Sequence, residues 1–180
     1  MVRSLNLREW CLLIKIPPSL KLWRAKQKSE MSKIKEQLYI LCGEYIMNRE
    51  GEIKQAIAEA REAANNETKS SAGDKYETGR ETMQQEIDLN ITRLNELNKL
   101  KQTLERIIPG QKSDVAVPGS VVRTNNGNYY IAIGAGKLKR DGVTYYAISA
   151  ESPIGEKLHG QKAGYTFEFN GKKFVIEGVS

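Results

Sequence analysis

Residues 63–77 read Ala-Ala-Asn-Asn-Glu-Thr-Lys-Ser-Ser-Ala-Gly-Asp-Lys-Tyr-Glu, a run of small and polar side chains between two long segments with helical spacing. Clusters of Asn, Ser and Gly between periodic segments are typical of turns. Before this run, apolar residues recur every three or four positions from Ile34 to Ala60, and after it the same spacing runs from Met83 to Ile108. Such spacing places the apolar residues on one face of a helix. The sequence therefore predicts two helices joined by an exposed turn.

The two helical segments have similar lengths, so we expect them to pack as an antiparallel coiled-coil hairpin over residues 31–109. Ser32 is the expected N-cap of the first helix, and Pro109-Gly110 is expected to end the second. An arm of about 33 residues extends roughly 50 Å at about 1.5 Å per residue. Asn90 and Lys101 fall on seam positions, so the seam is polar in places. The turn would then form the tip of a long, thin rod.

The rest of the chain, residues 115–180, carries strand signals. Alternating apolar and polar side chains predict strands at 120–124, 129–133, 144–148, 165–169 and 173–176. Asp141-Gly142 and Asn170-Gly171 favour tight turns, and the second pair suits a type I′ hairpin turn. A glycine-punctuated segment at 152–160 predicts one or two helical turns. The predicted fold class is therefore α+β, a helical hairpin followed by a small antiparallel sheet domain with a short helix.

The net charge of +6 is concentrated at the start of the chain. Residues 1–30 hold seven basic and two acidic side chains, so the remaining 150 residues carry a net charge of only +1. Met31 begins a segment that reads as an ordinary protein start, so we interpret residues 1–30 as a basic N-terminal extension that need not be native. A basic arm that contacts phosphate or an anionic surface is the alternative.

The composition, with 39% hydrophobic and 28% charged residues, is that of a soluble protein, and no apolar run is long enough to span a membrane. Cys11 and Cys42 lack metal-ligand spacing, and Cys42 lies in an apolar helical stretch where a free thiol is usually buried. These features favour a reducing, cytoplasmic setting. His159 is the only histidine, so the sequence argues against a Ser-His-Asp triad and against a metal site built from several histidines. We expect His159 to end the short helix.

A more specific signal is the string Ser152-Pro-Ile-Gly-Glu-Lys-Leu-His-Gly-Gln-Lys-Ala-Gly164, which precedes an alternating strand pair. Ala56-Ile-Ala-Glu-Ala-Arg-Glu62 lies just before the turn, and Tyr76 lies near its end. Over roughly residues 34–180, these stretches resemble the Gre family (GreA and GreB) of bacterial transcription elongation factors. The resemblance implies an N-terminal helical hairpin and, over residues 115–180, a domain with a fold like that of FK506-binding (FKBP) prolyl isomerases.

The resemblance also implies a partner and a way of acting. A Gre factor binds RNA polymerase through its secondary channel, and an Asp and a Glu at the hairpin tip help to hold a catalytic Mg²⁺ at the active centre. The polymerase then cleaves backtracked RNA, so the factor is an accessory protein rather than an enzyme, and it contacts RNA and DNA only indirectly. We accordingly expect a monomer without a cofactor of its own, since the Mg²⁺ is shared with the polymerase. The partner-binding candidates are Tyr76, Ser152, Pro153, Ile154 and Gly155.

The tip departs from the family pattern. Thirteen residues separate Glu62 from Tyr76, more than the family is expected to have, and counting from either side places no carboxylate at the acidic positions. The acids that are available as tip candidates are Glu67, Asp74 and Glu77, of which Glu67 and Asp74 are the metal candidates. Asp74 follows Gly73, so capping of the second helix is an equally good interpretation of this residue.

Other functions stay open. A non-cleaving modulator that occupies the secondary channel, in the manner of DksA-type factors, fits nearly as well as cleavage because the tip lacks the acidic pair. A coiled-coil interaction module without any link to polymerase is a second alternative, and a dimer that is stable on dilution would favour it. Prolyl isomerase activity in residues 115–180 is a remote alternative that needs a pocket lined by aromatic side chains. Direct RNA binding is weaker still, because the body of the chain is nearly neutral.

Overall fold

Over residues 18–67 and 73–180, the chain forms two long helices followed by six strands, with one short helix between the fourth and fifth strands. The computed structural model describes the backbone of residues 18–67 and 73–180 and the side chains of residues 30–65 and 79–180. The α+β class predicted from the sequence is confirmed. Among the helices in these ranges, none combines the length and the apolar content that crossing a membrane demands.

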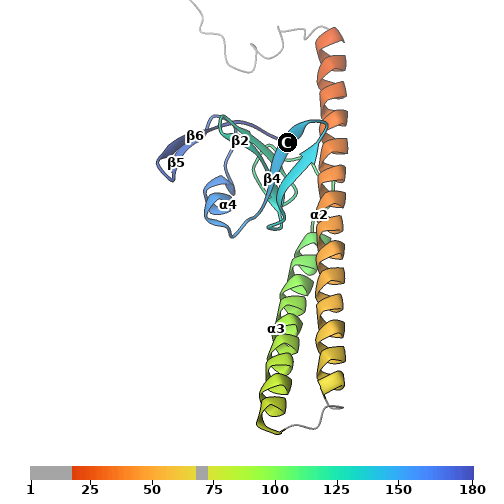
Figure 1. The fold of residues 1–180 in the computed structure, drawn as a ribbon. Coiled ribbons are helices and arrows are strands. Elements are labelled where there is room, and N and C mark those ends of the chain that lie inside the picture. The colour runs from red at the N-terminus through yellow and green to blue at the C-terminus, as the bar shows by residue number, and fades with distance from the viewer. Residues whose placement is uncertain (1–17, 68–72) are drawn as a thin grey trace, which may run out of the picture.

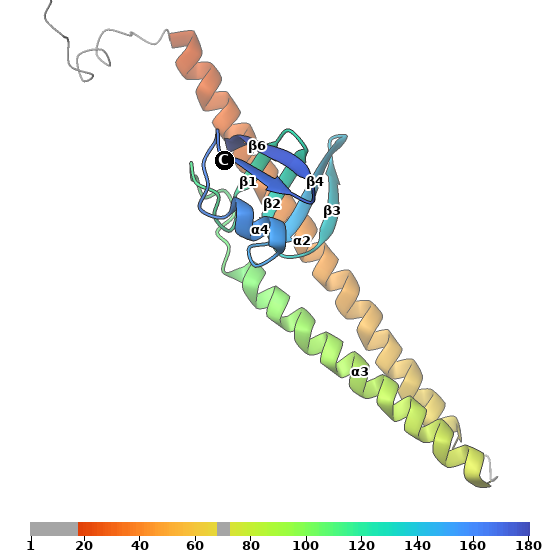
Figure 2. The ribbon, with the colours of Figure 1, turned by 90° about the vertical axis from the view of Figure 1, so that its left-hand side faces the viewer.

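Helix α2 spans Pro18–Glu67 and helix α3 spans Gly73–Glu105. The two helices lie side by side and run in opposite directions, and α3 begins near the end of α2 (Figures 1 and 2). At about 1.5 Å per residue, the 33 residues of α3 extend roughly 50 Å. The helix pair is therefore much longer than the domain that follows it.

Two predicted helix ends are wrong. α2 continues through Ser32, which is therefore not an N-cap, and the Ser32 hydroxyl instead donates to the Glu36 carboxylate at 3.4 Å. α2 contains no proline after its first residue, and its many Lys, Glu and Gln residues are good helix formers. α3 ends at Glu105, so Ile108 lies beyond the seam and is 66% exposed. The proline that follows Ile108 disfavours helical geometry at that position.

The apolar band of α2 is wider than a two-helix seam requires. Its most deeply buried apolar side chains are Leu38, Cys42 and Ile46, which lie in one cluster with residues of α3 and of the sheet. Because one edge of the band packs on α3 and the other on the sheet, residues on two adjacent stripes of the helix are buried. Cys42 is a buried free thiol, as predicted.

The six strands form a sheet with the order β3-β4-β2-β1-β6-β5. All five predicted strands are present, with ends shifted by a few residues. The strands are β1 Val121–Thr124, β2 Gly127–Ala132, β3 Gly136–Arg140, β4 Val143–Ser149, β5 Thr166–Phe169 and β6 Lys172–Val179.

The two predicted hairpin turns are confirmed by their backbone angles. Asp141 and Gly142 have φ values of 48° and 75°, and Asn170 and Gly171 have φ values of 51° and 71°. A type I′ turn needs positive φ at both central residues, which Asn, Asp and Gly adopt more readily than other residues. The local sequence therefore fixes where β3 turns into β4 and where β5 turns into β6.

The sheet is mixed, so the prediction of an antiparallel sheet is wrong. β2 and β4 pair in parallel, whereas the other neighbouring strands pair antiparallel. The parallel pair arises because β3, which is absent from the predicted strands, lies between them in the chain and packs on the outer side of β4. Leu138 is the only buried residue of β3, and Lys137 and Lys139 are exposed. Charged side chains are common on edge strands, where they discourage pairing with other chains.

The sheet separates two layers of core. Alternate residues of a strand point to opposite faces. In β2, Tyr130 joins the cluster that contains α2 and α3, whereas Tyr129 and Ile131 join a second cluster with Leu158 of helix α4 (Pro153–Leu158). Figure 1 shows α2 and α4 on opposite sides of the sheet. The sheet domain is thereby held against one part of the helix pair.

Candidate functional site

The helix pair extends beyond the sheet domain (Figures 1 and 2). On α2, Ile53 is the last residue that packs against the core shared with the sheet. The 14 residues from there to the end of α2 at Glu67 correspond to roughly 20 Å of helix. In this distal part, Ile57 and Ala60 pack with Ile87 of α3 in a small cluster of their own. The distal end is therefore supported by helix–helix packing and presents most of its surface outward.

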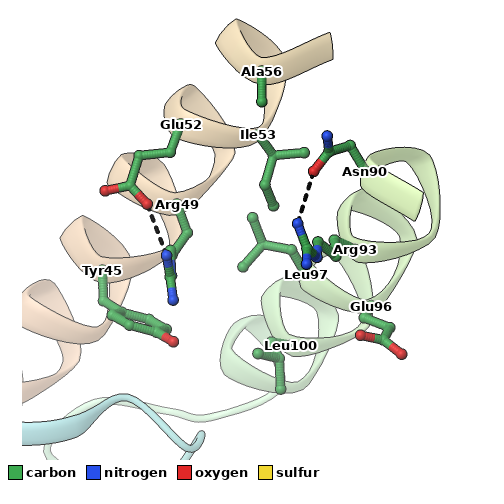
Figure 3. Close-up of a pocket in the computed structure, with 10 residues that line it drawn as sticks. All are labelled: Tyr45, Arg49, Glu52, Ile53, Ala56, Asn90, Arg93, Glu96, Leu97 and Leu100. Atoms are coloured by element: carbon green, nitrogen blue, oxygen red, sulfur yellow. Dashed lines mark hydrogen bonds and ion pairs between the residues drawn. The ribbon is translucent and has the colours of Figure 1, made fainter. Parts of the chain in front are cut away.

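A groove of about 520 Å³ lies between α2 and α3 where the distal part begins (Figure 3). Its middle is apolar and its edges are polar, with two basic and two acidic side chains among the residues that line it. These residues are Tyr45, Arg49, Glu52, Ile53, Ala56, Asn90, Arg93, Glu96, Leu97 and Leu100. Because the charges balance, the groove has no electrostatic preference for a strongly charged ligand such as nucleic acid.

The most deeply buried polar residue that lines the groove is Asn90. Only 3% of its surface is exposed, and its Oδ1 accepts a hydrogen bond from Arg93 Nη1 at 3.1 Å (Figure 3). The prediction of a polar position in the seam is confirmed at Asn90, whereas Lys101 is exposed. A buried Asn in a helix seam costs stability and fixes the register of the two helices. Arg93 belongs to α3 as well, so this hydrogen bond lies within one helix.

An ion pair lies on the α2 side of the groove. Arg49 Nη1 donates to Glu52 Oε2 at 2.9 Å, with 57% and 63% of the two side chains exposed. The hydrogen bond with Glu52, followed by one with Tyr45, raises the pKa of Arg49 above its ordinary value. Solvent-exposed pairs of this kind contribute little to stability. Arg49 therefore remains available to a partner that offers a carboxylate.

The predicted tip acids lie outside the described side chains. Glu67 is the last residue of α2, and Asp74 is the second residue of α3, followed in the same helix by Tyr76 and Glu77. The structure thus places all four at the distal end of the helix pair, while their side chains are not described. Their roles in holding Mg²⁺ or contacting a partner stay predictions. Among the described side chains, no group of three or more His, Cys, Asp or Glu residues is arranged to hold a metal ion.

The other partner-binding candidates lie in the sheet domain, around the start of α4. Ser152 is the N-cap, and its Oγ accepts from Gly155 N at 3.1 Å and donates to Ser149 O at 2.7 Å. Pro153 occupies the first helical turn and is exposed, whereas Ile154 packs against the second core cluster. The structure therefore gives these residues local folding roles, and it does not bring them together with the end of α3 that holds Tyr76.

Gly155 has a steric reason to be glycine. A Cβ atom built at this position would lie 2.1 Å from the backbone oxygen of Ser149 and 2.9 Å from that of Ala150. α4 therefore packs against the end of β4 with the backbone of Gly155 in direct contact. His159 ends the helix as predicted, since its backbone N–H donates to the Gly155 carbonyl at 2.8 Å.

A group of basic residues near the junction of α2 with the sheet domain was not predicted as a site from the sequence. Lys35 is only 2% exposed and lines a pocket together with Lys112 and Arg123. One signal was available, because Lys35 lies three residues before Leu38 on the stripe that continues through Cys42. No signal in the sequence links Lys35 to Lys112 and Arg123, which lie 77 and 88 positions later in the chain.

No family model, curated protein or solved structure matches the chain.

Proposed function

We propose that the chain is a Gre-like regulator that binds RNA polymerase by inserting its helix pair, as an antiparallel coiled-coil hairpin, into the secondary channel. The observation that carries the proposal is the roughly 20 Å of helix pair that projects past the sheet domain. A narrow channel admits two helices side by side, and a globular domain at their base limits how far they enter. The sheet domain, which we propose to be FKBP-like, would rest on the rim.

The distal part of the helix pair contributes little to the hydrophobic core of the protein. Its only described cluster of buried apolar residues consists of Ile57, Ala60 and Ile87, whereas the junction with the sheet buries a far larger set. Isolated helices are marginal in water and gain most of their stability from packing. A thin extension that buries so little is expected where its exposed end has a task, such as reaching a site inside another protein.

The mode of action depends on the acids at the distal end. If Glu67, Asp74 or Glu77 reaches the polymerase active centre, its carboxylate can help to hold a second Mg²⁺, since Mg²⁺ prefers carboxylate oxygens and retains several waters. The cleavage chemistry is then the polymerase's own. If none reaches it, the helix pair occupies the channel without stimulating cleavage, in the manner of DksA-type factors. Both modes share one docking geometry.

Binding and cleavage are tested separately. Polymerase is captured with the full chain and with a variant in which residues 66–72 are replaced by a four-residue Gly-Ser linker. The proposal predicts that both retain polymerase and that both compete with a second protein for the channel, because both keep the sheet domain and nearly all of the helix pair. Failure of the full chain to retain any polymerase would sink the proposal.

Cleavage is measured on stalled, backtracked complexes at saturating protein. In the cleaving mode, Glu67→Ala and Asp74→Ala each slow RNA cleavage without weakening polymerase binding. Glu81→Ala, which changes an exposed acid farther along α3 from its start at the distal end, is the matched control. Unchanged cleavage in the presence of the full chain, together with retained binding, selects the non-cleaving mode.

A further inference from the structure

A pocket of about 570 Å³ lies where α2, the segment after α3 and the first and last strands meet. Three basic side chains line it, each from a different part of the chain: Lys35 from α2, Lys112 from the segment between α3 and β1, and Arg123 from β1. Asp114 also lines the pocket. Positive charge therefore exceeds negative charge among the side chains that line it.

Lys35 is the unusual member of this group. Only 2% of its surface is exposed, yet within the part of the chain that the structure describes its ammonium group donates to one acceptor, the backbone oxygen of Gln111, at 2.5 Å. An ammonium group has three protons to donate, and burial of an ammonium without a counter-ion is costly. Burial accordingly lowers the pKa of Lys35 below its ordinary value.

The two other basic residues also lack acidic partners. Among the described side chains, no carboxylate forms an ion pair with Lys35, Lys112 or Arg123, and this includes Asp114. Lys112 and Arg123 are both exposed, so their side chains can turn toward a bound group. Three cations that line one pocket offer several charge-assisted hydrogen-bond donors to an anion bound there.

The strand pairing is irregular at Arg123. The pairing of β1 with β6 shifts register between Arg123 and Thr124. Such irregularities bend a strand and re-aim the side chain beside them. The guanidinium lies against Gly178 of β6, where an added Cβ would be only 3.0 Å from Arg123 Nη2. Gly178 therefore leaves room for the guanidinium at the edge of the pocket.

We propose that this pocket binds a small phosphate-bearing anion, with Lys35 at its base and Lys112 and Arg123 at its rim. Phosphate oxygens accept several charge-assisted hydrogen bonds at once, and a fork-shaped guanidinium can bind two of them. The bound anion would connect α2, the segment after α3 and β1. It would thereby stiffen the junction between the helix pair and the sheet domain. This site is independent of the proposed docking to polymerase.

The test is calorimetric titration of the full chain with pyrophosphate and with inorganic phosphate, at constant ionic strength set by chloride. We expect saturable binding of pyrophosphate that weakens by roughly tenfold in Arg123→Gln and in Lys112→Gln, since each removes a hydrogen bond to a charged group. Lys99→Gln removes an exposed charge on α3 outside the pocket and is expected to leave the affinity unchanged. Absence of saturable binding, or an equal loss in the control, overturns the proposal.

A second measurement locates the site without depending on one variant. In two-dimensional amide NMR spectra of the full chain, pyrophosphate is expected to shift signals of residues 110–114 and of Arg123, and to leave those of Ile57 and Ile87 in place. Lys35→Met, whose circular dichroism spectrum reports whether it folds, is expected to abolish these shifts. A short single-stranded RNA that binds while pyrophosphate does not would show that the pocket is not a small-anion site.

Discussion

The ionisation of Cys42 links the packing of α2 to the stability of the protein. The Cys42 side chain is fully buried between α2 and the sheet, and burial raises the pKa of its thiol to about 12. In the unfolded chain the thiol ionises with a pKa of about 8.5. Above that pH the unfolded state holds fewer protons than the folded state, so the free energy of unfolding falls as the pH rises. Between pH 7 and pH 9.5, the ionisation of Cys42 is expected to lower the free energy of unfolding by roughly 1.4 kcal/mol.

The assay is urea unfolding of the Cys11→Ser chain at pH 7 and at pH 9.5, compared with the same chain carrying Cys42→Ala. The Cys42→Ala chain is expected to be less stable at both pH values because the substitution creates a cavity. Its free energy of unfolding should, however, fall between pH 7 and pH 9.5 by roughly 1.4 kcal/mol less than that of the chain that keeps Cys42. Other titrating groups are common to both chains and cancel in this difference. Equal decreases in the two chains would refute the burial of Cys42 and, with it, the docking of the sheet on α2.

Three further predictions concern single positions. Gly155→Ala is expected to cost about 2 kcal/mol or more, because its Cβ would lie 2.1 Å from a backbone oxygen, whereas Gly134→Ala, which has open space, should change the unfolding free energy little. Tyr130→Phe removes a buried hydroxyl that has no hydrogen-bond partner among the described residues, so the free energy of unfolding in urea is expected to rise by about 1 kcal/mol, and a fall would contradict this. Asn90→Leu should raise the melting temperature and promote self-association in sedimentation, and Asn98→Leu, at an exposed position, should do neither.

Local patterns in the sequence predicted the helices, five of the six strands and two hairpin turns. Asn170-Gly171 shows why, because the residues themselves favour the positive φ values that the turn adopts. β3 escaped prediction because a strand at the edge of a sheet needs only one buried side chain, here Leu138, and the period-2 pattern is then too short to see. The parallel pairing of β2 with β4 depends on where β3 packs, which no local pattern specifies.

The candidate sites were predicted less completely than the fold. The string that begins at Ser152 was singled out as partner-binding, and the structure explains its members as a cap, a helix start and a tight backbone contact. Lys35, in contrast, was not predicted as a site residue, although it lies on the stripe of α2 that holds Leu38 and Cys42. Its burial depends on the segment around Gln111, which is distant in the sequence. No pattern in that segment indicates that it packs against α2. Sites assembled from separate segments become visible only once the fold is known.

Insertion of the helix pair into RNA polymerase is tested most directly by mapping what its distal end approaches. A hydroxyl-radical-generating iron chelate is attached to Ala64→Cys, near the end of α2, in the Cys11→Ser chain, where Cys42 is buried and does not react. The same chelate attached to Lys172→Cys, on the sheet domain, is the control. The proposed function predicts that the first position cuts the polymerase chain next to the active centre and the second cuts only at the channel rim. Cutting at the rim from both positions, or no cutting from either, would contradict it.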